Sequence, residues 1–121
     1  MSVSGRSPRG GSLVQLLILR TLFLSPMHGY KLLGEVNELM AGRRPMKTGS
    51  LYTILRRMEK AGLLESEWDE DHSRLDRRVY KLSKEGVEML KDGRKRVEEQ
   101  KRALDEMIAF YNEHFKEDLN S

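Results

Sequence analysis

Two adjacent arginines, Arg56 and Arg57, are the side chains in this sequence with the most specific binding chemistry. A guanidinium group presents a planar fork of N–H donors that can hold a phosphate or the edge of a guanine with two parallel hydrogen bonds. Thr48 and Ser50 precede the arginines and would lie at the start of the same helix, where hydroxyls and free backbone N–H groups can hold a phosphate. This combination indicates contact with nucleic acid.

The residues around these four add further groups that could touch DNA. Gly49 would let the backbone approach a phosphate, and Lys47 would add a positive charge. Tyr52 has two open interpretations, because its hydroxyl could reach the sugar-phosphate chain or its ring could pack beside Tyr30 and Tyr80. The candidate contacts in this segment are Lys47, Thr48, Gly49, Ser50, Tyr52, Thr53, Arg56, Arg57 and Lys60.

These candidates also have purely structural explanations. Arg56 and Arg57 could be solvated helix charges paired with nearby glutamates such as Glu59. Thr48 could cap the helix. His28 could contact a phosphate, although a structural hydrogen bond is the commoner role for such a histidine.

Composition limits the classes of protein to be considered. A chain of 121 residues with 38% apolar residues has room for one domain with a modest core. Charged residues make up 34% of the chain but the net charge is only +3, so a positive surface must arise from segregation of charge. The absence of cysteine excludes disulfides and cysteine-ligated zinc and is consistent with the cytoplasm. The three histidines are scattered, so no metal site and no cofactor are expected.

Two segments could be mistaken for targeting signals. Residues 1–11 carry basic charge but run into no small-residue cleavage site, which predicts a flexible basic arm and not a signal peptide. The most apolar run, Leu13 to Leu24, is too short to span a bilayer and is interrupted by Gln15 and Arg20. No membrane partner is therefore expected.

The elements that would position the arginines follow a simple order. Ser12 can cap a helix through about Leu24, which is apolar nearly all round and should be buried. Ser25 and Pro26 are suitable as N-cap and first residue of a second helix, running to about Met40.

The arginines then lie on a third helix with two distinct faces. At 100° per residue, Leu51, Ile54, Leu55 and Met58 share one face, and Gly49, Thr53, Arg56 and Lys60 lie opposite. Gly62 would stop this helix, and the segments LLESEW and VYKLS form two strands joined by the charged loop DEDHSRLDRR. Three helices followed by a hairpin predict a winged helix, whose third helix enters the major groove.

The final predicted helix runs unbroken from Lys84 to about Lys116, roughly 50 Å at 1.5 Å per residue. Its residues form a heptad seam with an apolar start and end and with Arg94 and Lys101 in the middle, which favours pairing with a second chain. The alternative is one amphipathic helix folded back on its own domain. Gly93 would be a weak point or a site of close contact. The predicted dimer contacts are Val87, Leu90, Val97, Leu104, Ile108, Tyr111 and Phe115.

The expected fold class is thus mainly α with a small β-hairpin, a winged helix-turn-helix plus one long C-terminal dimerisation helix. We divide the chain into a flexible basic arm (1–11), a winged-helix DNA-binding domain (12–83) and the dimerisation helix with a short tail (84–121).

The segments MHGYKLLGEV, TGSLYTILRRMEKAGLLESEW and RRVYKLSKEGVEML, in this order and at these spacings, resemble the PadR family of transcriptional regulators over about residues 13–92. The resemblance implies a winged-helix homodimer of the shorter branch, usually a repressor of a nearby operon. It also implies release from an inverted-repeat operator by a small, often aromatic or drug-like effector.

The predicted wing departs from the family pattern, because it reads SRLDRRVY where relatives commonly read Gly-Arg-Pro-Arg-Lys before the tyrosine. Arg74, Arg77 and Arg78 match the family's basic positions, so the resemblance implies contacts with the DNA backbone. Asp76 is left out, because an acidic residue near the tip should weaken the approach of a phosphate.

For the effector, the candidate residues are Trp68, Met89, Arg94 and Met107. Cations in the middle of the seam could attract an acidic aromatic ligand, and methionine adapts to varied shapes. In most proteins such residues set the register of a coiled coil or fill a core.

An operator-binding regulator in the cytoplasm is the expected function, with double-stranded DNA and a second copy of the chain as partners. Two alternatives remain open, a winged-helix protein-interaction module and an architectural protein that binds DNA without sequence preference. An enzyme is not expected, because no nucleophile-and-base pair and no phosphate loop is recognisable.

Overall fold

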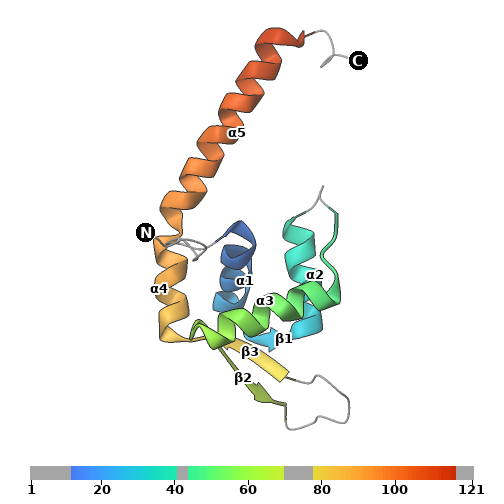
Figure 1. Cartoon of the computed structure of the whole chain (residues 1–121), viewed down its shortest axis with the longest axis vertical. Helices are drawn as coiled ribbons and strands as arrows, with labels where there is room; N and C mark the ends of the chain where they lie inside the picture. The colour runs from blue at the N-terminus through green and yellow to red at the C-terminus, as the bar shows by residue number, and fades with distance from the viewer. Residues whose placement is uncertain (1–11, 41–43, 70–77, 117–121) are drawn as a thin grey trace.

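The computed structural model describes residues 12–40, 44–69 and 78–116. Their elements are, in chain order, α1 (Leu13–Leu24), β1 (Met27–His28), α2 (Gly29–Leu39), α3 (Thr48–Lys60), β2 (Leu64–Trp68), β3 (Arg78–Leu82), α4 (Lys84–Asp92) and α5 (Arg94–His114) (Figure 1). The predicted fold class is confirmed, since a mainly helical winged helix-turn-helix with a small sheet precedes a long C-terminal helix. The predicted basic arm lies outside the described residues.

Helix α1 begins where the sequence predicts it. The Ser12 hydroxyl accepts a hydrogen bond from the backbone N–H of Gln15, and the Gln15 side chain accepts one from the backbone N–H of Ser12, which forms a capping box. Phe23 and Leu24, however, remain 59% and 68% exposed. The expectation of a helix buried all round is therefore wrong at its C-terminal end, because hydropathy does not reveal which faces the neighbouring helices cover.

The second helix begins later than predicted. Ser25 and Pro26 do not start it, because Met27 and His28 form a short strand that pairs antiparallel with β3, opposite Tyr80 and Val79. This strand satisfies the backbone groups on the open edge of β3. The sheet therefore has three strands in the order β1-β3-β2, where the sequence predicts only the hairpin of β2 and β3. A strand of two residues is too short to show the alternation that predicts strands.

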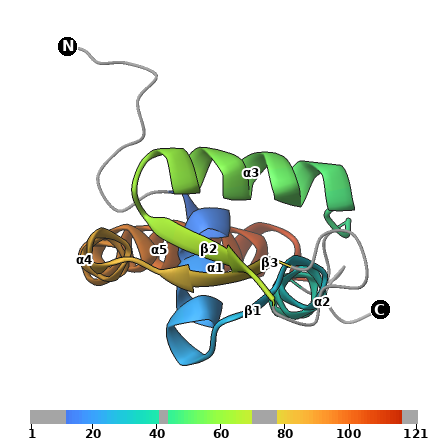
Figure 2. The ribbon, with the colours of Figure 1, turned by 90° about the horizontal axis from the view of Figure 1, so that it is seen from below.

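The core lies where α1 meets α2, α3 and the sheet. Its fully buried side chains come from all these helices, and Figure 2 shows α3 running across one side of the domain, with α2 and α4 at opposite ends. The largest of them are Ile18, Leu19, Leu22, Leu32, Val36, Leu51, Leu55 and Met58. Each such side chain stabilises the fold by about 1.5–3 kcal/mol relative to exposure, so this cluster holds α3 firmly by its inner face.

A glycine stops α3 and starts the hairpin, as predicted. Gly62 has a positive φ of 84°, which glycine adopts without steric cost. Its N–H bonds to the carbonyl of Glu59, and the N–H of Leu63 bonds to the carbonyl of Met58, the pattern of a Schellman motif. The chain thereby turns directly from the cationic helix into β2.

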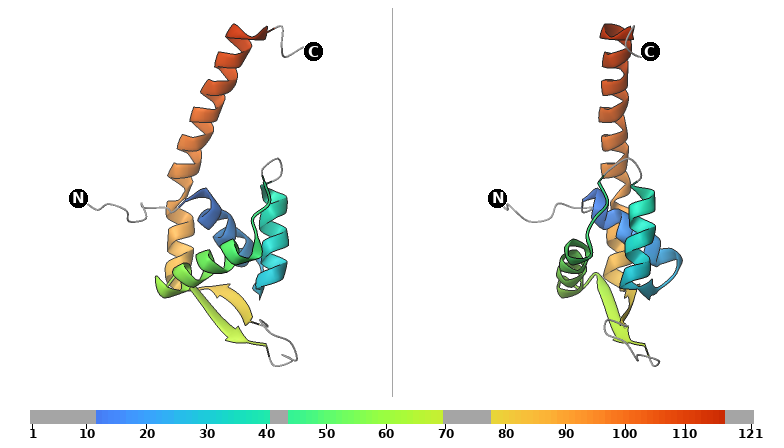
Figure 3. Two further views of the ribbon diagram at one scale, coloured as in Figure 1. Left: turned by 45° about the vertical axis from the view of Figure 1, so that its right-hand side comes forward. Right: turned by 90° about the vertical axis from the view of Figure 1, so that its right-hand side faces the viewer.

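The C-terminal helical segment spans 31 residues, from Lys84 to His114, and divides into α4 and α5 at Gly93. The backbone of Gly93 stays right-handed helical, with φ −72° and ψ −12°, and its carbonyl accepts a hydrogen bond from Val97. A Cβ at this position would lie 2.4 Å from Leu16 Cδ2, so Gly93 is a site of close contact with α1. Beyond it α5 leaves the domain (Figure 3).

Candidate nucleic-acid interface

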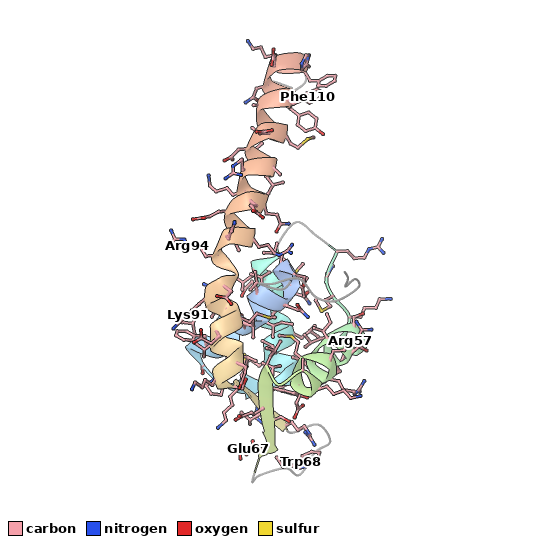
Figure 4. All side chains as sticks on the ribbon, turned by 60° about the vertical axis from the view of Figure 1, so that its left-hand side comes forward. Arg57, Glu67, Trp68, Lys91, Arg94 and Phe110 are labelled. Atoms are coloured by element: carbon pink, nitrogen blue, oxygen red, sulfur yellow. The ribbon has the colours of Figure 1, made fainter. Side chains whose placement is uncertain are left out.

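Helix α3 presents two opposite surfaces. Leu51, Leu55 and Met58 are buried, and Ile54 is half-buried. The opposite face carries exposed candidates for DNA contact, namely Gly49, Ser50, Thr53, Arg56, Arg57 and Lys60. Because the apolar face is fixed in the core, the cationic face is held outward on a rigid element, as Figure 4 shows for Arg57.

The start of α3 differs from the sequence-based alternative for Thr48. Lys47 is the N-cap residue and makes no side-chain capping bond to the described residues, and Thr48 is already helical. Thr48 is therefore not the cap. The first-turn N–H groups of α3 belong to a stretch in which Lys47, Thr48 and Ser50 are exposed, so an anion could accept hydrogen bonds from them.

Asn37, which the sequence analysis did not single out, binds the backbone of the segment that precedes α3. The side-chain amide of Asn37 donates to the carbonyl of Met46 at 3.2 Å and accepts from its N–H at 2.8 Å. An asparagine inside a helix gives no sequence signal for such a contact, because its partner lies on a separate segment. Asn37 thus fixes the backbone just before Lys47.

Tyr52 packs against the start of α2. Its hydroxyl and ring lie over Gly29, where a Cβ would come within 2.5 Å of the Tyr52 oxygen, and Tyr30 is 65% exposed. Tyr52 therefore packs on Gly29, and it lines the same cleft as Tyr80. The half-buried ring still lines an open cleft next to Arg56.

This cleft separates α3 from the sheet and has a volume of about 500 Å³. Its walls are polar and carry both signs of charge, from Tyr52, Arg56, Glu59, Arg78 and Tyr80. Arg56 comes from the candidate reading helix and Arg78 from the base of the predicted wing. The cleft is thus the place where the two parts proposed to contact DNA meet.

Glu59 does not pair with Arg56 or Arg57 among the described residues. Its carboxylate instead accepts a hydrogen bond of 2.7 Å from the Ser66 hydroxyl, and lies 3.9 Å from Nη1 of Arg78. Arg78 Nη1 also donates to the Ser66 oxygen at 2.7 Å. The arginine that the family resemblance assigns to the DNA backbone is therefore engaged with α3 and β2. Arg74 and Arg77 lie outside the described residues, as do Leu75 and Asp76.

His28 lies on β1, the edge strand opposite β2, and contacts the residue that follows β2. Its Nε2 lies 2.9 Å from Oδ2 of Asp69, which connects β1 to the residue that follows β2. His28 thus makes a structural hydrogen bond, the commoner of the two roles considered for it.

The effector candidates do not form one pocket within a single described chain. Trp68 lies at the outer end of β2, far from Arg94 along the domain (Figure 4), and Met89 packs against the core from α4. Arg94 bonds to Glu98 at 3.0 Å, and Met107 is exposed further along α5. Since α5 leaves the domain, its later residues cannot share a cavity with the wing in the same protomer.

A second surface is apolar and was not predicted. A groove of about 580 Å³ lies between α1 and the junction of α4 and α5. It is lined by Leu13, Leu16, Leu17, Arg20, Phe23, Leu24, Leu90, Gly93, Arg94, Val97 and Glu98. The sequence signal was the apolar outer side of α1, which suggested a buried helix but equally fits a surface that another molecule covers.

The heptad residues fall into two groups. Val87 and Leu90 are half-buried on α4, beside their own domain. The remaining seam residues are exposed, on α5 at Val97 (44%), Leu104 (61%), Ile108 (57%) and Tyr111 (47%), and at its C-cap residue Phe115 (45%). The alternative of a helix folded back on its own domain therefore does not hold for α5, which has no buried residue.

The described ranges contain neither a candidate metal site nor a candidate membrane-spanning helix. No group of three or more potential ligands among His, Asp and Glu could hold a metal ion there. Nor is any helix in those ranges both long and apolar enough to cross a bilayer.

Comparison with known proteins gives consistent results. The model of the transcriptional regulator PadR-like family matches residues 18–92. A PadR family transcriptional regulator from Eggerthella lenta is 31% identical, with 84% of this chain and 82% of that chain covered and a TM-score of 0.58. A candidate transcriptional regulator from Thermoplasma acidophilum is 28% identical over 80% of this chain and 91% of that chain, with a TM-score of 0.71.

A more distant structure shares the fold. PadR of Bacillus subtilis, solved in complex with operator DNA, is 20% identical over 67% of this chain and 46% of that chain, with a TM-score of 0.58. A search of curated proteins finds no match.

Proposed function

Because this chain belongs to the transcriptional regulator PadR-like family, we propose that two copies bind an inverted-repeat operator and repress transcription in the cytoplasm. Family membership confirms the resemblance in the sequence motifs and makes the chain a DNA-binding regulator and not an enzyme. In the proposed complex α3 reads the major groove, and α5 joins the two copies.

The observation that carries the assignment is the division of α3 into a buried apolar face and an exposed cationic face. A helix held in this way can enter the major groove without disturbing the core. Arg56 and Arg57 would supply bidentate contacts to guanine or phosphate, and Thr48 and Ser50 would hold phosphate at the helix start. Bacillus subtilis PadR, which has a similar fold, was solved with operator DNA, and this is consistent with DNA binding by the present chain.

The apolar stripe on α5 supports the proposed homodimer. Leu104, Ile108 and Tyr111 recur at heptad spacing and have no cover within the described chain, and a paired helix would bury them. The groove beside α1 continues this apolar surface at Val97 and could receive part of the same partner. Two reading helices held in this way would occupy successive major grooves about 34 Å apart.

The family resemblance implies a small-molecule effector, and we place it in the groove beside α1, at the proposed dimer interface. The groove is mostly apolar, and its charged lining residues are Arg20, Arg94 and Glu98, which together carry a net positive charge although Arg94 bonds to Glu98. A small acidic aromatic molecule would find both apolar contacts and a positive charge there. Such a molecule would release the operator if it bound better to an arrangement of the two copies that does not fit the DNA.

Selection of bound duplexes from a random DNA pool, followed by titration of the winners at two salt concentrations, tests the proposal. We expect a two-fold symmetric consensus whose affinity falls steeply with salt, because phosphate contacts release counterions. Retention of DNA without a consensus would support an architectural protein instead. No retention even at low salt would make the exposed face of α3 a protein-binding surface.

A further inference from the structure

Glu59 is an acidic residue on the helix proposed to read DNA. It follows Arg56 by three residues, so the two side chains lie on neighbouring parts of the helix surface, and both line the cleft between α3 and the sheet. A carboxylate in this position would repel a nearby phosphate. Its presence therefore needs a reason within the structure.

The contacts of Glu59 join three elements. Its Oε2 on α3 accepts from Ser66 Oγ on β2 at 2.7 Å, and Ser66 Oγ accepts from Nη1 of Arg78 on β3 at 2.7 Å. The direct distance from Arg78 Nη1 to Glu59 Oε2 is 3.9 Å. One hydroxyl thus bridges the charged groups of the helix and the hairpin.

The guanidinium of Arg78 is also held from the hairpin itself. Its Cζ lies 4.8 Å from the centre of the ring of Trp68, the residue directly opposite it in the register of β2 and β3. A cation over an indole ring is attracted by the ring's negative face. Arg78 is therefore fixed between an indole on one side and the Glu59–Ser66 pair on the other.

These contacts are too exposed to hold the fold together. The side chains of Arg78 and Glu59 are 39% and 35% exposed, and ion pairs at such sites contribute about 0–1 kcal/mol after solvent screening. The buried cluster beneath α3 contributes far more. What the network can determine is the direction in which the outer half of the hairpin points, because Leu64 is buried at the base of β2 while Trp68 is 54% exposed at its end.

We propose that Glu59 is a positioning residue which, through Ser66 and Arg78, sets the orientation of the β2–β3 hairpin relative to α3 so that both reach the DNA together. In this role Arg78 contacts other side chains of the protein and not the DNA. It also neutralises the Glu59 carboxylate, which lies next to the exposed face of α3. The inference rests on the proposed DNA-binding function and concerns how the two contact surfaces of one protomer are aligned.

The sign of the effect of Glu59→Ala on DNA affinity tests the proposal. By charge alone, removal of an acidic residue near DNA should strengthen binding. We expect the opposite, weaker binding to the selected operator, together with a shallower salt dependence. The slope should fall by about 0.9 for each phosphate that the hairpin no longer contacts.

Glu65→Ala is the matched control. Glu65 lies on β2, the strand that carries Ser66, and pairs with Lys81 at 3.8 Å, so its removal also deletes one acidic charge and one exposed ion pair of the hairpin. It makes no hydrogen bond or ion pair to α3 among the described residues. Glu65→Ala should leave the salt slope unchanged and the affinity equal or slightly higher.

The double variant Glu59→Ala, Arg78→Ala separates positioning from direct contact. If Arg78 works through Glu59, the double variant should bind about as well as the weaker single variant. The proposal would be overturned if the losses of affinity in the two single variants added up in the double variant. It would also be overturned if Arg78→Ala lost affinity and Glu59→Ala did not. Either result would make Arg78 a direct phosphate contact.

The only tryptophan of the chain, Trp68, provides a readout that does not depend on DNA. Its emission should change in Glu59→Ala, because the arginine above the ring is then released from one of its anchors, and should stay the same in Glu65→Ala. The conservative variant Glu59→Gln can still accept a hydrogen bond from Ser66 and should retain most of the affinity for DNA. It replaces Glu59→Ala in the test if the alanine variant fails to fold.

The possible failures are distinguishable. The positioning role alone would be overturned if the wild-type protein bound its operator with a steep salt slope and Glu59→Ala bound equally well or better. Wild-type protein without salt-dependent DNA binding would overturn the proposed function and, with it, this inference.

Discussion

Gly93 rests directly on Leu16, at a distance where a Cβ on the glycine would overlap the leucine side chain at 2.4 Å. This contact lies at the junction of α4 and α5, the point at which the C-terminal helix stops packing on its own domain. It therefore connects the core of the winged helix to the direction in which the proposed dimerisation helix leaves.

A methyl group at Gly93 should destabilise the protein, although alanine favours helices. Gly93→Ala would gain about 1 kcal/mol of helix propensity, but the displacement of buried Leu16 costs about 1–3 kcal/mol. Gly34→Ala is the control, because a Cβ there meets nothing within 4 Å and should stabilise α2 by about 0.5–1 kcal/mol. Urea unfolding of both variants measures the difference. Equal stabilisation by both would mean that Leu16 yields without cost.

Replacement of Arg56 and Arg57 together by alanine should abolish specific binding to the operator. Removal of one bidentate arginine–base pair costs about 1–3 kcal/mol, or roughly 5-fold to 150-fold in affinity. Lys95→Ala with Arg102→Ala removes the same charge from exposed positions of α5 and should change affinity little. Fluorescence titration with labelled duplex measures both. Unchanged operator affinity in the arginine variant would contradict the assignment of α3.

Aspartates on the apolar stripe should separate the two copies. Leu104→Asp with Ile108→Asp would bury two charges in the seam, a penalty of several kcal/mol, so light scattering should show monomers. Ala103→Asp with Ala109→Asp places the same charges on α5 at positions outside the heptad seam and should leave the dimer intact. Dimers that persist after the first change would show that the chains associate through another surface, such as the α1 groove.

Ser83 should matter more for stability than Ser12, although both cap helices. The Ser83 hydroxyl accepts from Gly86 N–H at 3.0 Å and donates to the carbonyl of Gly62, and the residue is only 8% exposed. Ser83→Ala removes both bonds and should cost about 2–3 kcal/mol. Ser12→Ala removes one exposed cap and should cost about 1 kcal/mol. Thermal unfolding compares the two, and an equal destabilisation would mean that the Gly62 carbonyl finds another donor.

Local sequence signals predicted three features that depend only on residues close together in the chain. The capping box at Ser12, the positive φ of Gly62 and the two faces of α3 depend on spacings of a few residues, and all three are present. The strand of Met27 and His28 was missed because its strand partner is β3, some fifty residues later in the chain. The packing of Tyr52 on Gly29 is also a contact between distant segments, so no local pattern indicates it.

The candidate interface shows the same division. Periodicity placed Arg56 and Arg57 on the outer side of α3, since a helix determines which residues share a face. It could not assign Glu59 to Arg78, because the partner of a charged side chain is decided by which elements pack side by side. Nor could it separate Val87 and Leu90 from the rest of the heptad, since only the packing of α4 beside α1 removes them from the free stripe.

The sequence by itself therefore determined the order of the helices and of the β2–β3 hairpin, the cationic face of α3 and the heptad spacing of the C-terminal helix, all of which follow from short-range helix and turn geometry. Only the tertiary structure decided the third strand, the groove beside α1, the close contact at Gly93 and the Glu59–Ser66–Arg78 network. These features depend on contacts between segments distant in the chain, whose approach is set by the packing of the whole core and not by any local pattern.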